Sequence, residues 1–168
     1  TASDYFGLSV TYLNSGEMEV TTIDFPEGTD EFFSVSDVAV NLSYARTMTD
    51  RLNIGLTMKY VREQIWREVA STVAFDIGSQ FNTGIRGIVL GMAITNFSQE
   101  MKFDGPDLDV TTDINDVNQG NVEKDARLLT ESWPLPLVFR MGIKVDLLGG
   151  MNQNIKSMNH RFSVFLDG

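Results

Sequence analysis

Aspartates crowd one stretch of the chain and come nearest to a recognisable chemical site. Asp104, Asp107 and Asp109 lie within six residues of one another, and Asp113 and Asp116 follow. Carboxylate oxygens are the ligands that calcium prefers, but the spacing lacks the alternate ligands, central glycine and final glutamate of an EF-hand loop. We therefore predict a solvated acidic loop, with calcium binding as a hypothesis.

The remaining composition excludes most catalytic and metal chemistry. The 168 residues include no cysteine, which excludes disulfides, thiolate metal sites and cysteine nucleophiles. His160 is the only histidine, so a multi-histidine zinc site is excluded and a Ser-His triad has one possible base. The net charge of -10 opposes binding to nucleic acid. We expect a protein that is not an enzyme and carries no cofactor.

The acidic charge is concentrated in two stretches that are rich in turn-forming residues. Residues 14–37 hold seven acidic residues and no basic residue, and residues 98–131 hold nine acidic residues against Lys102, Lys124 and Arg127. Pro26 and Pro106 lie in these stretches. We predict two long loops, at 14–36 and 98–134, on a scaffold that is close to neutral.

The scaffold alternates apolar and polar residues with a period of two, which is typical of β-strands. No window shows the helical spacing of apolar residues over three turns. The pattern predicts an all-β, antiparallel protein with seven strands, at about 5–13, 37–47, 52–64, 69–82, 87–97, 135–147 and 160–167.

Each predicted strand has one face of large apolar residues and one face of small or charged residues. The charged residues of the second face are Lys59, Asp76, Arg140, Lys144 and Asp146. If the sheet closes into a barrel, these side chains face the lumen, where they could contact a polar ligand or cargo segment. The interpretation we favour is that they pair with one another, because pairing is the usual way to keep charges ionised inside a protein.

Three features favour a membrane-spanning β-barrel over a soluble sheet. Most predicted strands have 9–14 residues, and a strand needs about 9–11 to cross a bilayer. Long connections fall at one end of the strands and tight turns at the other, as in outer-membrane barrels. Tyr12, Tyr60, Trp66 and Trp133 lie near the acidic end, where an interfacial aromatic girdle is expected.

Seven strands leave two open edges, which lipid does not tolerate. We therefore expect residues 1–168 to form one partial β-barrel domain of a longer chain. This expectation fits a chain that begins at Thr1 without a signal peptide and stops part way along its last strand.

Apolar residues within the first acidic loop are candidate contacts for a partner protein. Phe25, Phe32 and Phe33 lie among its acidic residues and could anchor a binding partner. They could equally fold back and plug the barrel mouth. The sequence does not decide between these two interpretations.

Six blocks along the chain resemble the PorV/PorQ family of outer-membrane proteins in their order and spacing. The blocks are YLNSGEMEVTTIDFPEGT (12–29), LSYARTMTDRLNIGLTMKYVREQIW (42–66), AFDIG (74–78), TGIRGIVLGMAITNF (83–97), MKFDGPDL (101–108) and ESWPLPLVFRMGI (131–143). The resemblance implies a FadL-like barrel, of which this chain is an internal portion.

The resemblance also implies a place in the bacterial outer membrane and a role in type IX protein secretion. Such barrels bind secreted cargo proteins and hand them to components of the secretion system at the cell surface. The resemblance provides no catalytic motif that could be transferred to this chain. The alternative is a FadL-like outer-membrane transporter of hydrophobic small molecules.

Overall fold

A computed structural model describes residues 3–113, 123–148 and 162–168 of the chain, which form an all-β protein. The main strands are β1 (Asp4–Glu19), β2 (Phe32–Thr49), β3 (Leu52–Ile65), β4 (Glu68–Asn82), β5 (Ile88–Ser98), β8 (Val138–Leu148) and β9 (Phe162–Asp167). Between β5 and β8 lie the short 3-10 helix η1 (Pro106–Leu108) and the strands β6 (Asp109–Asp113) and β7 (Glu123–Arg127). No helix in the described ranges is long and apolar enough to cross a membrane.

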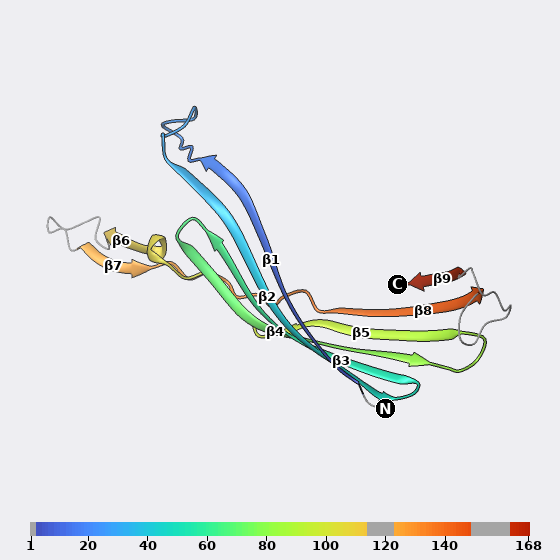
Figure 1. The fold of residues 1–168 in the computed structure, drawn as a ribbon. Helices are drawn as coiled ribbons and strands as arrows, with labels where there is room; N and C mark the ends of the chain where they lie inside the picture. The colour runs from blue at the N-terminus through green and yellow to red at the C-terminus, as the bar shows by residue number, and fades with distance from the viewer. Residues whose placement is uncertain (1–2, 114–122, 149–161) are drawn as a thin grey trace.

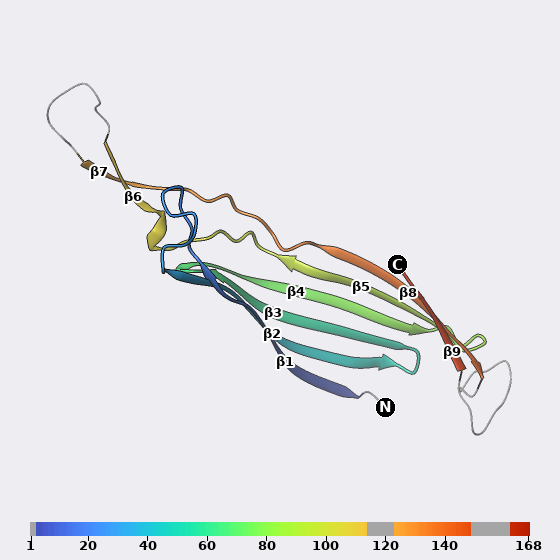
Figure 2. The same cartoon turned by 90° about the horizontal axis from the view of Figure 1, so that it is seen from above.

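The seven main strands form one antiparallel sheet in the order β1-β2-β3-β4-β5-β8-β9. Neighbours along the chain are neighbours in the sheet, except that the β6–β7 excursion separates β5 from β8. The sheet is strongly curled into a half-barrel (Figures 1 and 2). The predicted all-β class, antiparallel pairing and seven strands are confirmed, and β1 and β9 form the two edges of the sheet.

The first acidic loop is shorter than the sequence pattern indicated. The prediction that all of residues 14–36 are loop is wrong, since β1 continues to Glu19 and β2 begins at Phe32. The two strands pair beyond a bulge at Asn14–Glu17, where Gly16 has a φ of 77°. The side chain of Asn14 accepts a hydrogen bond from the Gly16 backbone at 2.7 Å. Residues 14–19 are mostly polar and show no alternation, so periodicity alone could not reveal this extension of β1.

The second acidic loop contains ordered structure that the sequence analysis missed. η1 and the β6–β7 hairpin lie within 98–134, and the hairpin projects beyond the end of the main sheet (Figures 1 and 2). Met101 and Trp133 pair through two backbone hydrogen bonds of 2.9 Å, and Asp104 pairs in the same way with Val69 of β4 at 3.0 Å. The long connection is therefore tied to the start of β4.

The two faces of the half-barrel differ in chemistry and in exposure. Rows of apolar side chains continue from strand to strand in register, and one row is formed by Phe6, Tyr44, Leu56, Ile77, Ile94 and Phe139. Each of these side chains is more than a third exposed, whereas Lys59 and Asp76 on the other face are about 20% exposed. Because side chains converge on the inside of a curled sheet, we call the polar side the inner face and the apolar side the outer face.

The described residues bury almost no hydrophobic core. The buried hydrophobic residues among them are Ala70, Ala74 and Met101. An exposed apolar surface of this extent marks an interaction surface in a folded protein. The outer face therefore needs an apolar environment that the described chain does not supply.

Candidate functional site

The inner face of the half-barrel carries a polar network centred on an ion pair between β3 and β4. The Lys59 Nζ atom lies 2.7 Å from Asp76 Oδ2, and both side chains are about four-fifths buried. In the register of the two strands, Lys59 is opposite Ala74 and Asp76 is opposite Thr57, so the charged residues are diagonal neighbours on one face. The small Ala74 leaves room for the lysine to reach across.

Asn96 joins this pair because β5 contains a bulge. The pairing register of β4 and β5 shifts between Phe75 and Ile77, and Asn96 adopts a φ of 65°. The extra residue in β5 brings Asn96 onto the inner face, where simple alternation after Thr95 would have turned it outward. Asparagine tolerates this left-handed backbone conformation better than most residues.

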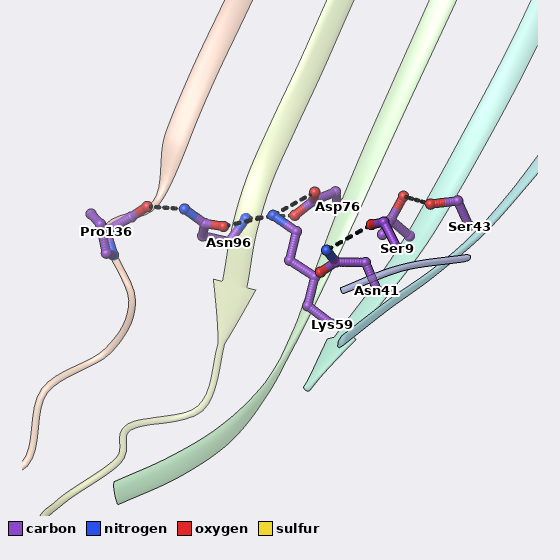
Figure 3. Close-up of polar contacts among 8 residues, drawn as sticks. Ser9, Asn41, Ser43, Lys59, Asp76, Asn96 and Pro136 are labelled. Atoms are coloured by element: carbon purple, nitrogen blue, oxygen red, sulfur yellow. Dashed lines mark hydrogen bonds and ion pairs between the residues drawn. The ribbon is translucent and has the colours of Figure 1, made fainter. Parts of the chain in front are cut away.

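The contacts of Asn96 extend the network across four segments of the chain (Figure 3). Its side-chain Oδ1 accepts a hydrogen bond from Lys59 Nζ at 2.9 Å, and its backbone N–H donates to Asp76 Oδ1 at 2.8 Å. Its Nδ2 donates to the carbonyl of Pro136 at 3.0 Å, just before β8. Asn96 is not among the residues predicted for the inner face. The sequence does carry a signal for the bulge. Ile94 and Phe97 are three positions apart, which breaks the alternation of apolar and polar residues, and both lie on the outer face.

Neutral polar pairs continue the inner face toward β1. The Asn41 Nδ2 atom donates to Ser9 Oγ at 3.0 Å, and the hydroxyls of Ser43 and Thr57 lie 2.9 Å apart (Figure 3). These contacts link β1, β2 and β3. The inner face is thus polar from the β1 edge to the start of β8.

The second pair of predicted inner charges lies near the opposite end of the sheet. Lys144 Nζ is 3.2 Å from Asp146 Oδ1, and Ser163 Oγ donates to the same oxygen at 2.6 Å. The Lys144 ammonium also lies 5.9 Å from the centre of the Phe165 ring. The favoured interpretation, that these charges pair, agrees with four of the five predicted residues.

Arg140 is the exception among the predicted inner charges. It lies on the inner face opposite Ala93, and no carboxylate of the described residues lies within ion-pair distance of it. It borders a shallow groove of about 550 Å³ whose floor includes Gly55, Gly78 and Gly142. These glycines leave the inner sheet surface without bulky side chains.

The three calcium candidates make ion pairs with arginines instead of converging on one point. Asp107 pairs with Arg67, and Asp104 pairs with Arg127. Asp109 lies 3.5 Å from Arg127, and Glu68 accepts a hydrogen bond from the Asp107 backbone at 2.8 Å. No group of three potential ligands is close enough to hold a metal ion in the described part of the chain. Asp116 lies outside the described residues.

The three partner-binding candidates do not form one patch. Phe25 lies in the connection 20–31 and is 62% exposed. The prediction that Phe32 and Phe33 lie in a loop is wrong, because they begin β2 and pair with Glu19 and Met18. Phe32 is exposed, whereas the Phe33 ring packs against Trp66 with a centroid distance of 6.5 Å.

The four predicted girdle aromatics occupy different environments. Tyr12 and Tyr60 lie on the apolar outer face, 63% and 46% exposed. Trp66 lies in the β3–β4 turn, with the guanidinium of Arg67 5.1 Å from its ring centre. Trp133 is half-buried and packs against Phe103 at 5.2 Å. Their placement at a membrane interface stays a prediction.

Comparison with known proteins returned no match: no family model, curated protein or solved structure matches this chain.

Proposed function

We propose that this chain forms part of the wall of a non-enzymatic β-barrel in the bacterial outer membrane. The observation that carries the proposal is the contrast between the exposed apolar outer face and the inner face with its paired charges. On β3 the apolar outer positions run from Leu52 to Tyr60, and on β4 they run from Val73 to Phe81, with Ser79 as the one interruption. Nine residues match the length that a tilted strand needs to cross a bilayer.

The open edges of the sheet support a larger, closed barrel. Unpaired backbone groups at β1 and β9 would be costly in lipid, because no water is present to satisfy them. Residues 4–13 of β1 contain no proline, lysine or arginine, the residues that often protect a free edge. We infer that further strands pair with both edges in the complete protein.

The role we propose for the barrel is that of the PorV/PorQ type, binding or shuttling secreted cargo proteins in type IX secretion. The resemblance of the six sequence blocks supports this role. The long connections supply an accessible surface, with Ile23 fully exposed and Phe25 exposed among Asp24, Glu27 and Asp30. Exposed apolar residues with an acidic rim suit a partner that offers apolar and basic side chains.

A FadL-like transporter of hydrophobic small molecules is the alternative. It requires a continuous apolar path along the lumen. The polar residues of the inner face, from Ser9 through Lys59 and Asp76 to Asp146, weigh against such a path.

The test uses the full-length protein and a matched pair of substitutions on neighbouring residues of β3. Leu56→Arg places a charge on the outer face, and Thr57→Arg places one on the inner face. If position 56 faces lipid, Leu56→Arg costs about 2–4 kcal/mol at the bilayer midplane. We expect Leu56→Arg to reduce insertion into lipid vesicles strongly and Thr57→Arg to leave it near the wild-type level.

Equal insertion of both variants, or recovery of the wild-type protein in the soluble fraction of cells, contradicts the membrane proposal. The cargo role is tested separately, by proteolysis of intact cells followed by cargo pull-down. We expect cleavage within 20–31 from outside the cell. A membrane-bound protein that retains no secreted protein would favour the transporter alternative.

A further inference from the structure

An apolar groove lies on the outer face near the tight-turn end of the sheet. Its volume is about 880 Å³, which is within the range of small-molecule sites. The main apolar side chains that line it are Leu52, Phe81, Leu90, Met92, Ile143 and Leu166. The five strands that contribute to it are consecutive in the sheet. Leu52 is opposite Phe81, Phe81 is opposite Leu90, Leu90 is opposite Ile143, and Ile143 is opposite Leu166.

A small residue deepens the groove. Ser79 lies on the outer face between Ile54 and Met92 in the register, where larger side chains occupy the neighbouring strands. It lines the groove and is only partly exposed, whereas Phe81 at the next outer position of β4 is 43% exposed. The groove is therefore a depression in the apolar band and not a flat part of it.

Two arginines lie in the tight turns next to this groove. Arg51 directly precedes Leu52, and Arg86 lies in the turn that joins β4 to β5. The Arg51 guanidinium packs against Gly84 of that same turn. A Cβ atom added to Gly84 would lie 3.0 Å from the Arg51 Cζ atom. Both arginines are exposed, and no carboxylate in the described ranges lies within ion-pair distance of either.

The combination of an apolar groove and free cations at its end points to an amphiphilic ligand with an anionic head. We propose that the groove binds an anionic glycerophospholipid, with its acyl chains against the apolar side chains of the groove and its phosphate at Arg51 and Arg86. Arginine binds phosphate through several N–H donors at once. Asp50 is the acidic residue of these turns. Asp167 also lines the groove, but it is opposite Gly142 in the register, so its side chain lies on the inner face. The head-group region at the two turns therefore carries one net positive charge.

This inference rests on the proposed membrane location, because only then does the outer face meet lipid. In that location the tight turns lie opposite the long acidic loops. One net positive charge near a membrane surface corresponds to about a fivefold preference for an anionic lipid. The site is thus expected to select by head group, while the rest of the apolar band is not.

The test places a tryptophan in the groove of the full-length protein inserted in phosphatidylcholine vesicles. Phe81→Trp is the reporter, with Leu90→Trp as a second reporter if the first does not insert, and Leu56→Trp is the control outside the groove. Trp66 and Trp133 are changed to Phe in every variant. Quenching is measured with increasing fractions of acyl-brominated phosphatidylglycerol or acyl-brominated phosphatidylcholine.

We expect half-maximal quenching of the groove reporter at about a fivefold lower fraction of the anionic lipid. Arg51→Gln with Arg86→Gln should abolish this difference, and the Leu56 reporter should respond equally to both lipids. Equal responses in the groove, or a preference that survives the arginine changes, overturns the lipid site while leaving the membrane proposal intact. If neither the groove reporter nor the Leu56 reporter is quenched, the membrane proposal is overturned and the lipid site with it.

Discussion

Removing the charge of Asp76 should destabilise the half-barrel more than removing the charge of an exposed ion pair. Asp76→Asn keeps the shape of the side chain but leaves the Lys59 ammonium, which is about four-fifths buried, beside neutral partners. Breaking a fully buried pair costs about 3–5 kcal/mol, and an exposed pair contributes about 0.2–1 kcal/mol. With side chains about 20% exposed, the Lys59–Asp76 pair lies between these limits, and we expect a loss of about 2 kcal/mol.

The chain offers a matched control for this measurement. Asp4 and Arg46 form an ion pair at 3.5 Å in which both side chains are about half exposed. Asp4→Asn should therefore cost no more than about 0.5 kcal/mol. Both variants are compared by urea unfolding of the vesicle-inserted full-length protein, with the free energy of unfolding obtained by linear extrapolation.

A double-mutant cycle separates the pair from its surroundings. Lys59→Met removes the cation, and combining it with Asp76→Asn should recover part of the loss, because no uncompensated charge remains. We expect a coupling energy of about 1–2 kcal/mol. A coupling below about 0.3 kcal/mol, or equal costs for Asp76→Asn and Asp4→Asn, would show that water screens the inner face and that the network does not stabilise the sheet.

Three further predictions concern the bulge, the exposed aromatics and the acidic loop. Asn96→Ala should lower the free energy of unfolding by about 1–3 kcal/mol, because it removes side-chain hydrogen bonds and places alanine at a positive φ. Asn96→Gly removes the same hydrogen bonds but accepts this φ, so the difference between the two variants separates the two causes. Phe25→Ala should weaken cargo retention in a pull-down without changing the free energy of unfolding by more than about 0.5 kcal/mol, whereas Phe33→Ala should lower the free energy of unfolding through the lost contact with Trp66. If Phe25→Ala retains cargo as the wild-type protein does, Phe25 is not part of the binding surface. Chelation with EGTA should leave the melting temperature unchanged, since the described aspartates are paired with arginines, and a clear decrease would revive the calcium hypothesis.

Much of the fold follows from local patterning that the sequence displays openly. Alternation with a period of two defines both faces of each strand, so the polar placement of Lys59, Asp76 and Lys144 could be predicted without knowledge of pairing. The tight turns at 50–51 and 83–87 follow from short polar segments between two alternating runs. Uniform polarity conceals strands, which is why residues 14–19 and the β6–β7 hairpin were predicted as loop.

The contacts that make the inner face a network depend on register, which the sequence does not display. Alternation placed Lys59 and Asp76 on the same face, but only the pairing of β3 with β4 makes them diagonal neighbours. Asn96 reaches them because one extra residue in β5 reverses its direction, and a single inserted residue flips every later side chain of a strand.

The amino-acid sequence by itself determined the all-β class, the number of main strands, the two chemically different faces and the concentration of acid in the long connections. These properties depend on residues close together in the chain, where the period of two acts directly. Tertiary structure alone decided which charges pair, that the aspartates of the long connection meet arginines, and that a groove interrupts the outer face beside Arg51 and Arg86. The ion pairs join residues up to 40 positions apart in sequence, and the groove brings together residues as distant as Leu52 and Leu166. These properties therefore exist only after the strands have taken their register and the sheet has curled.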